Sequence, residues 1–258
     1  MTEWPENRAN VAGFHNSGTM ADGMLPARGG HFVNQDPAVF DAPFISMTPG
    51  EAAGMDPSQR WALEASYLCF ENAGMPLEKL NGLRTAVFGS CMSEDYKTML
   101  FKDPQSLPPG FFNLVGPSIV VDTACSGSIV ALDLACQLLH NGDASMALVV
   151  GANLLLAPQS TMILGNMGFL SPDGRCFSFD KRANGYARGE GVLPMIVKPL
   201  VDAVADNDTI WAKAGLGPYL TCYVEAYDTG IPTGDQIETS ALLRAFGDYR
   251  SQHELLYL

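Results

Sequence analysis

Short apolar runs alternate with helical patterns along most of this chain. Runs rich in β-branched and apolar residues predict strands at 85–89, 118–121, 146–151 and 221–226. The run at 146–151 is apolar throughout, which is typical of a central strand covered on both faces. A further strand is expected over 191–198, where Pro194 cannot donate to a ladder and would either weaken the strand or place it at an edge.

Two segments carry both the start and the stop signals of a helix. The first begins at Asp56 and Pro57 and ends at Gly74. The second spans 235–246, with acidic residues in its first turn and a glycine after its end. Residues 1–50 are rich in glycine and proline, so we expect surface loops there. Because helices alternate with strands and no linker interrupts them, the sequence predicts a single α/β domain with layered sheets.

The segment 118–140 is the most informative part of the chain. A short apolar strand, expected to be buried, runs into a tight turn of small residues that holds Cys125. A helix should follow over about 126–140, and since it is apolar nearly all round we expect it to be buried. The thiol then lies at a helix N-terminus, where unpaired N–H groups and the helix dipole favour the reactive thiolate. Strand, sharp turn, nucleophile and helix follow one another as in the nucleophile elbow of serine hydrolases.

Cys125 allows two interpretations. It can be a nucleophile, because the small residues Ser126, Gly127 and Ser128 let a substrate approach the sulfur. It can also be a small buried residue in a helix cap, because a free cysteine packs like a small hydrophobe. The flanking residues favour the nucleophile.

Composition excludes several classes of function. The chain has 258 residues, 47% of them hydrophobic, and a formal net charge of −13. A large core is therefore expected, and neither nucleic acid nor an anionic membrane is a fitting partner, since both attract basic surfaces. The six cysteines form no C-x-x-C pair, so neither a zinc site nor a disulfide framework is expected. With no secretory signal and no apolar run of spanning length, the setting we expect is reducing and cytoplasmic.

Several segments of the chain resemble one family, and they occur in the family's order. They lie at 28–32, 40–44, 55–60, 71–74, 121–128, 165–191 and 224–238. Together they are similar to the ketosynthase (β-ketoacyl synthase) domain of iterative, fungal-type polyketide synthases, a member of the thiolase-like fold. The segments 121–128 and 185–191 are the most specific of these.

The resemblance implies a fold, a reaction and partners. The fold would be the layered α/β/α/β/α arrangement of thiolase-like proteins, incomplete here. Residues 1–258 would form a single partial ketosynthase domain, mostly its N-terminal half, with the C-terminal half starting from about 211. Cys125 would carry the growing acyl group as a thioester. An acyl carrier protein would deliver a malonyl unit on its phosphopantetheine arm, and loss of carbon dioxide would give the enolate that attacks the acyl thioester. The resemblance also implies a homodimer, with acyl and malonyl thioesters as substrates and no tightly bound cofactor.

The chain departs from the family where that reaction needs hydrogen-bond donors. The family uses two histidines, and the first falls at Tyr227, whose hydroxyl donates one neutral hydrogen bond and which lacks a second ring nitrogen. Loss of one such donor typically slows other enzymes by about 10²–10³-fold. The second histidine motif lies beyond Leu258. Thr229 and Thr233 correspond to residues that would bond the pantetheine arm, and turn formation is their alternative role.

Three stretches of the family pattern are also expected to be missing. They are the first strand, a segment between Leu107 and Phe111, and a segment between Trp211 and Gly215. A sheet without internal strands exposes edges and apolar faces. The sequence therefore leaves three functions open: a condensing β-ketoacyl synthase, an acyl-holding or interaction module that forms no carbon–carbon bond, and an inactive fragment of a larger synthase.

Overall fold

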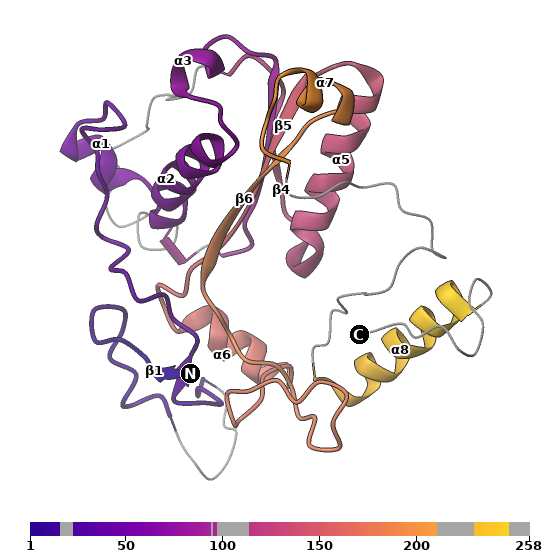
Figure 1. The fold of residues 1–258 in the computed structure, drawn as a ribbon. Coiled ribbons are helices and arrows are strands. Elements are labelled where there is room, and N and C mark those ends of the chain that lie inside the picture. The colour runs from indigo at the N-terminus through magenta and orange to yellow at the C-terminus, as the bar shows by residue number, and fades with distance from the viewer. Residues whose placement is uncertain (16–22, 94, 97–113, 211–229, 248–258) are drawn as a thin grey trace. The chain divides into compact units, whose positions relative to one another are not determined.

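The computed structural model of this chain describes residues 1–15, 23–93, 95–96, 114–210 and 230–247. The described residues form two compact units (Figure 1). The larger unit contains Val33–Leu156 and Gly189–Ala212. The smaller unit contains Met1–Phe32, Ala157–Arg188 and the described part of Lys213–Leu258.

The larger unit is built on a four-stranded mixed sheet of order β4-β3-β5-β6. Its strands are β3 (Thr85–Ser90), β4 (Ser118–Val121), β5 (Met146–Asn153) and β6 (Gly191–Val197). Strand β3 is parallel to both β4 and β5, whereas β6 pairs antiparallel with β5. All four strands were predicted from the sequence, and Pro194 lies on an edge strand as expected.

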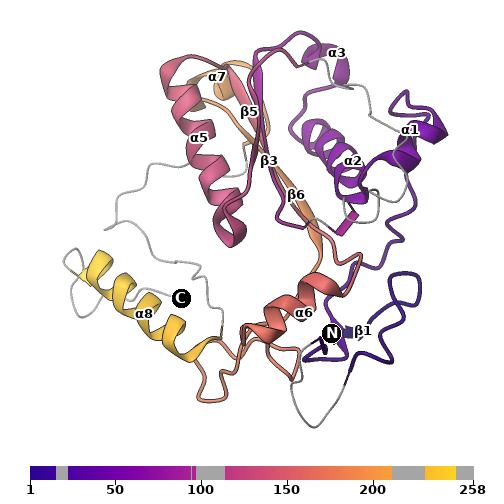
Figure 2. The same cartoon turned by 180° about the vertical axis from the view of Figure 1, so that it is seen from behind.

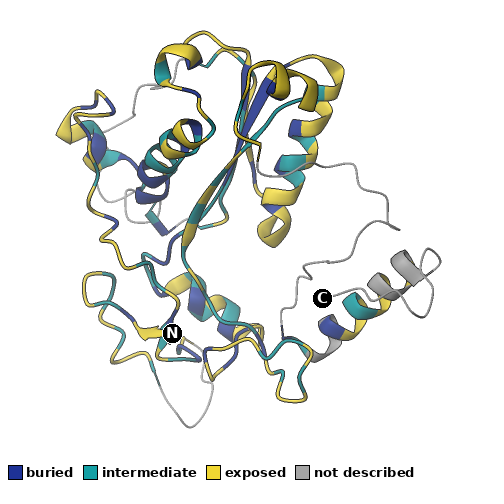
Figure 3. Ribbon diagram, viewed as in Figure 1, coloured by how far each residue is buried: buried dark blue, intermediate teal, exposed yellow. Residues whose placement is uncertain are grey.

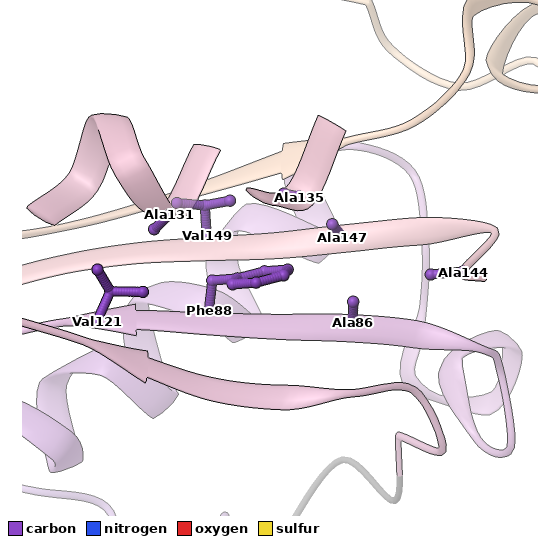
Figure 4. Close-up of a cluster of buried hydrophobic side chains, with 8 residues drawn as sticks. All are labelled: Ala86, Phe88, Val121, Ala131, Ala135, Ala144, Ala147 and Val149. Atoms are coloured by element: carbon purple, nitrogen blue, oxygen red, sulfur yellow. The ribbon is translucent and has the colours of Figure 1, made fainter. Parts of the chain in front are cut away.

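Helices cover both faces of this sheet. Helix α2 (Pro57–Asn72) packs on one face and α5 (Gly127–Asn141) on the other (Figures 1 and 2). Since side chains alternate along a strand, β5 sends Ala147 and Val149 toward α5 and Leu148 toward α2. Figure 4 shows the cluster on the α5 side, which centres on Phe88 of β3. The expectation that β5 is covered on both faces is therefore confirmed.

The predicted caps hold α2 in place. Asp56 accepts a hydrogen bond from the Ser58 N–H at 2.7 Å, and Pro57 is the first helical residue. Gly74 ends the helix with a φ of 81°, a conformation that favours glycine. The remaining helices of the larger unit are short: α1 (Pro49–Gly54), α3 (Leu77–Leu80) and α7 (Leu200–Ala205).

The smaller unit consists mainly of loops. Strand β1 (Thr2–Glu3) pairs antiparallel with β2 (Gly29–Gly30), and α6 (Gln159–Asn166) and α8 (Pro232–Gly247) are its helices. Helix α8 confirms the helix predicted at 235–246. It starts three residues earlier because proline is well tolerated in a first turn. The strand expected at 221–226 lies outside the described residues.

Two expectations of burial are wrong (Figure 3). Strand β4 is exposed at three of its four positions, with Val120 79% exposed. Helix α5 buries only Gly127, Ala131 and Ala135, while Ile129 is 69% exposed. The reason is that β4 forms an edge of the described sheet and α5 packs through one narrow stripe of small residues. An apolar pattern indicates which side chains avoid water, but it does not indicate what covers them.

Candidate active site

Cys125 lies in the sharp turn between β4 and α5. The chain leaves β4, passes through a single 3₁₀ turn, η1 (Ala124–Ser126), and enters α5. Ala124 has a φ of 53°, in the left-handed region that non-glycine residues rarely adopt. Backbone strain of this kind clusters at functional sites. The order expected of a nucleophile elbow is therefore present, with a strained residue directly before the cysteine.

Local hydrogen bonds fix the backbone on both sides of Cys125. Asp122 Oδ1 accepts a hydrogen bond from the Ala124 N–H at 3.2 Å. Ser126 Oγ donates to the carbonyl of Thr123 at 2.8 Å and to its hydroxyl at 3.0 Å. Aspartate, serine and threonine favour such short-range bonds to the backbone, which is how this sequence specifies the turn. The Cys125 side chain is exposed, so its interpretation as a buried cap residue is wrong.

Small residues allow the first turn of α5 to contact the ends of the strands closely. A Cβ added at Gly127 would overlap Ser90 Oγ at the end of β3. A Cβ added at Gly151 of β5 would lie 2.6 Å from Ser128 Oγ. The start of the helix thus touches the ends of two neighbouring strands, and a larger residue at either glycine would push the helix outward.

The elbow lies at the place where the strand connections diverge. Ser90 pairs in register with Val121 on one side and with Gly151 on the other. The chain runs from β3 to β4 on one side of β3 and then to β5 on its other side. Open α/β sheets bind ligands outside the carboxyl ends of their strands at such a switch point. Cys125 therefore lies at the carboxyl-end side of the parallel strands, where such folds bind ligands.

The described cysteines differ in accessibility. Cys125, Cys136 and Cys176 are exposed, whereas Cys69 and Cys91 are partly buried. Burial is the main cause that raises the pKa of the Cys69 and Cys91 thiols. These two are expected to react slowly at neutral pH, because the thiolate is the nucleophile.

Two acidic residues of the segment 165–191, Glu190 and Asp180, bind groups of nearby loops. Glu190 accepts hydrogen bonds from the N–H groups of Val33, at 3.0 Å, and Leu155, at 2.8 Å. Asp180 pairs with Arg182 at 3.0 Å, and the hydrogen bonds from that side chain lower the pKa of Asp180. These hydrogen bonds and this ion pair account for both carboxylates, without a role in acid–base catalysis.

A second cluster, in the smaller unit, joins the family-like segments 165–191 and 224–238. Asp235 is only 5% exposed and accepts hydrogen bonds from the N–H groups of Gly230, at 3.1 Å, and Phe179, at 2.8 Å. The carbonyl of Gly230 accepts from the Gly185 N–H at 3.1 Å. The first turn of α8 is thereby tied to the glycine-rich motif at 185–188. The sequence pointed to Asp235 only as an acidic residue of a first helical turn.

Of the predicted site residues, Cys125 is the one whose side chain the structure describes. Tyr227 and Thr229 lie outside the described residues. Thr233 belongs to the first turn of α8, and its side chain is outside the description. Within the ranges that the structure describes, no cluster of His, Cys, Asp or Glu could hold a metal ion. No helix of these ranges is both long and apolar enough to cross a membrane.

An exposed cysteine in a strained turn between a strand and a helix is the arrangement expected of enzymes that use a cysteine nucleophile. The chain belongs to the β-ketoacyl synthase family, whose N-terminal domain matches residues 1–108 and 109–203 and whose C-terminal domain matches 201–257. It is similar to "Highly reducing polyketide synthase 2" of Gibberella zeae, with 44% identity over 100% of this chain and 12% of that protein. It is 42% identical to lovastatin diketide synthase mokB of Monascus pilosus, over 94% of this chain and 11% of that protein.

Solved ketosynthases share the thiolase-like fold of this chain. The ketosynthase from module 6 of the bacillaene synthase of Bacillus subtilis 168 superposes with a TM-score of 0.85 and 32% identity. A ketosynthase domain of Streptomyces albus oxazolomycin biosynthesis gives a TM-score of 0.87 and 30% identity. Each match covers 98% of this chain, but only 50% and 53% of the respective solved chains. The chain thus spans about half the length of these ketosynthases and about an eighth of the curated relatives.

The comparisons also locate one internal difference from the family. The match to the N-terminal domain is split between residues 108 and 109, inside the stretch where the sequence indicates a missing segment. The alignment with the Gibberella zeae protein extends over 308 positions against 258 residues, a difference of 50 positions. These positions of the relative have no counterpart in this chain.

Proposed function

We propose that this chain acts as a β-ketoacyl synthase of polyketide biosynthesis, with Cys125 as the residue that carries the acyl group. The observation that carries the proposal is the exposed Cys125 on its strained elbow at the switch point of the sheet. The relatives named above are polyketide synthases, which supports polyketide rather than another acyl chemistry.

The first step is acyl transfer to the cysteine. The Cys125 thiolate attacks the carbonyl carbon of an acyl thioester, a new carbon–sulfur bond forms, and the donor thiolate leaves and takes up a proton. Cys125 directly precedes α5, and the unpaired N–H groups of a first helical turn favour negative charge at that end of the helix. The exposed position of Cys125 lets a donor on a long flexible arm reach it.

The second step is decarboxylative condensation. A malonyl thioester loses carbon dioxide, and the resulting enolate carbon attacks the acyl group on Cys125. The bond to the Cys125 sulfur breaks, the thiolate is restored, and the β-ketoacyl product stays on the donor of the malonyl unit. Both the enolate and the tetrahedral intermediate need donors for an oxyanion. Tyr227 is the residue of this chain that corresponds to the family's first histidine donor.

The partners follow from this chemistry. We propose an acyl carrier protein whose phosphopantetheine arm presents the acyl and malonyl thioesters, with Thr229 and Thr233 as contacts of that arm. We treat residues 1–258 as one partial ketosynthase domain that works as a homodimer. Five described cysteines are free thiols, which fits the cytoplasm as its compartment.

A second candidate function is an acyl-holding module that does not condense. Tyr227 favours it, because a neutral tyrosine replaces an imidazole donor of the family. Changing Tyr227→His separates the two functions. If donor strength limits the reaction, decarboxylation of malonyl carrier protein should rise by up to about 10²–10³-fold. Tyr227→Phe is the matched control and should show no gain.

The test of the proposed function is acylation of the 258-residue chain. Incubation with an octanoyl thioester should give one adduct by intact mass, and peptide mapping should place it on Cys125. Cys136 is the matched control, because it is also exposed but lies within α5. Cys125→Ala should abolish the adduct and Cys136→Ala should leave it unchanged. Equal acylation of both cysteines, or none on Cys125, would contradict the proposed function.

A further inference from the structure

A buried carboxylate that the proposed reaction does not use joins two segments of the smaller unit. Asp235, in the first turn of α8, is only 5% exposed. Its Oδ1 accepts a hydrogen bond from the Gly230 N–H at 3.1 Å, and its Oδ2 accepts one from the Phe179 N–H at 2.8 Å. Each oxygen of this carboxylate therefore binds the backbone of a different segment. Hydrogen bonds to a carboxylate are about twice as strong as those between neutral groups, so the junction is held firmly.

Unusual backbone conformations meet at this junction. Phe179 has a φ of 58°, in the left-handed region, although it is not a glycine. Gly230 has a φ of 69°, and Gly185, whose N–H donates to the Gly230 carbonyl at 3.1 Å, has a φ of 124°. Strain such as that at Phe179 persists only where the surrounding structure holds it, and it clusters at functional sites. Asp235 is a side chain that holds it here, because it binds the N–H of Phe179 itself.

The junction has no room for side chains at its glycines. A Cβ added at Gly230 would lie 3.0 Å from the Gly185 carbonyl oxygen and 3.1 Å from the Phe177 nitrogen. A Cβ added at Gly185 would lie 2.6 Å from the Ser171 nitrogen. The turn at Gly230 is therefore fixed by close packing as well as by hydrogen bonds.

This fixed turn follows the residue that the proposed reaction uses as a donor. Tyr227 precedes Gly230 by three residues in the sequence. A donor to a developing oxyanion is effective only when it is held in place, and a misplacement of about 1 Å can slow a reaction about 10²-fold. Since so little chain separates the two residues, whatever fixes Gly230 also limits how far Tyr227 can move.

We propose that Asp235 is a positioning residue, which fixes the turn at Gly230 and thereby the place of the Tyr227 hydroxyl. The inference rests on the proposed function and deepens it by naming the side chain on which its oxyanion donor depends. Asp235 acts through the backbone of Gly230 and Phe179 rather than through contact with the reacting atoms.

The first measurement is amide hydrogen exchange, which needs no turnover. In Asp235→Asn one oxygen remains as an acceptor, but an NH₂ group faces the other backbone N–H, so one hydrogen bond is lost. Exchange in the peptide 224–231 should become at least about tenfold faster in this variant, because its local opening no longer breaks a bond to a carboxylate. Exchange in β5, which belongs to the larger unit, should stay the same.

The second measurement is decarboxylation of malonyl carrier protein in the two Tyr227 variants of the proposed function. In Tyr227→His, which carries the stronger donor, adding Asp235→Asn should lower kcat at least about tenfold. In Tyr227→Phe, which has no donor to position, the same addition should change kcat less than about twofold. A residue that only stabilised the fold would lower both rates equally.

The matched control is Asp180→Asn. Asp180 also accepts a backbone hydrogen bond in the smaller unit, from the Arg182 N–H at 2.9 Å, but this bond lies within one loop. The control should keep the exchange of 224–231 and both decarboxylation rates. Asp235→Glu is the conservative variant: it keeps the charge but is one methylene longer, and it should show smaller changes in the same direction. It provides the same readouts if Asp235→Asn does not give a cooperative thermal transition.

Two results would overturn the inference. One is unchanged exchange of 224–231 in a folded Asp235 variant, and the other is an equal fall of kcat in both Tyr227 variants. A chain that decarboxylates nothing in any variant would instead contradict the proposed condensation. The exchange measurement would then decide by itself whether Asp235 holds the segment that carries Tyr227.

Discussion

Close contact at one glycine determines whether the elbow of Cys125 can form. The first turn of α5 meets the end of β3 at Gly127, where any Cβ would overlap Ser90 Oγ. If the turn moved outward, Cys125 would leave its place above the β3 and β5 strand ends. The strain at Ala124 shows that the backbone is already held in an unusual conformation there.

Gly127→Ala should therefore lower stability and slow the reaction of Cys125. Overpacking at a tight contact typically costs about 1–3 kcal/mol. Denaturant unfolding should measure the loss, and iodoacetamide labelling should measure the exposure of the thiolate. Adding Ser90→Ala to this variant should restore part of the stability, because it removes the overlapping Oγ.

Gly89→Ala is the matched control for this change. Gly89 is the neighbour of Ser90 in β3, and nothing lies within 4 Å of a Cβ placed there. This variant should unfold and react like the unchanged chain. If Gly127→Ala and Gly89→Ala proved equally stable, the close contact at Gly127 would not determine the stability of the elbow.

The sequence indicated some residues of the site but not their partners. Cys125 and the small residues after it were recognisable because strand, turn and helix signals are local. Ser90 and Gly151 were not recognisable as partners of α5, because that contact depends on the register of three strands that are distant in sequence.

At the scale of elements, local signals predicted position well and burial poorly. The caps at Asp56 and Gly74 correctly predicted the two ends of α2, because a cap acts within one helical turn. The burial of β4 and α5 was overestimated, because burial depends on neighbours that a local pattern does not specify. Pro194, by contrast, correctly indicated an edge strand, because a missing N–H is a property of the residue itself and does not depend on its neighbours.

The connection from β6 to α7 contains a partly buried lysine that pairs with two carboxylates. Lys198 forms ion pairs with Asp206 and Asp208, and its side chain is 14% exposed. Burial alone would lower the pKa of Lys198, but the hydrogen bonds with these carboxylates outweigh it and the pKa is raised. The hydrogen bond from Lys198 in turn lowers the pKa of Asp206.

This connection should make the larger unit sensitive to acid. Because the folded-state pKa of Asp206 lies below its ordinary value, its ion pair stabilises the fold above that ordinary value. The contribution is lost as pH falls through the lowered pKa. The Tm of the chain should therefore fall as pH drops below about 4, the ordinary pKa of an aspartate, and Asp206→Asn should flatten this dependence.

Asp202→Asn provides the comparison for that experiment. Asp202 lies in the first turn of α7 and forms no ion pair in the part of the chain that the structure describes. Its variant should keep the full dependence of Tm on pH. Equal slopes for Asp206→Asn and the unchanged chain would show that the lysine connection does not govern acid stability.

At the scale of the whole molecule, apolar surface remains uncovered in the larger unit. Val120 on β4, Leu193 on β6 and Val201 on α7 are 79%, 72% and 80% exposed. Contiguous exposed apolar surface and a free strand edge both favour association with other chains. The solved ketosynthases that this chain matches are about twice as long as the part it covers. The expected gaps predicted exposed edges, and Pro194 indicated that β6 would be one of them, but nothing in the sequence indicated that β4 would be the other.

Self-association should therefore proceed through β4, and one charge on this strand should weaken it. Within the described sheet β4 is an edge, and its polar backbone groups on that side can pair with another strand. Val120→Lys places a charge on the most exposed residue of that edge, and lysine at such positions is how natural sheets block pairing. Sedimentation at about 50 µM should show assemblies for the unchanged chain and at least about fivefold weaker association for Val120→Lys.

Val39→Lys, at a 68% exposed loop position away from the sheet, should associate like the unchanged chain. If both lysine variants weakened association equally, net charge rather than the β4 edge would be its cause, because only Val120→Lys alters the edge itself.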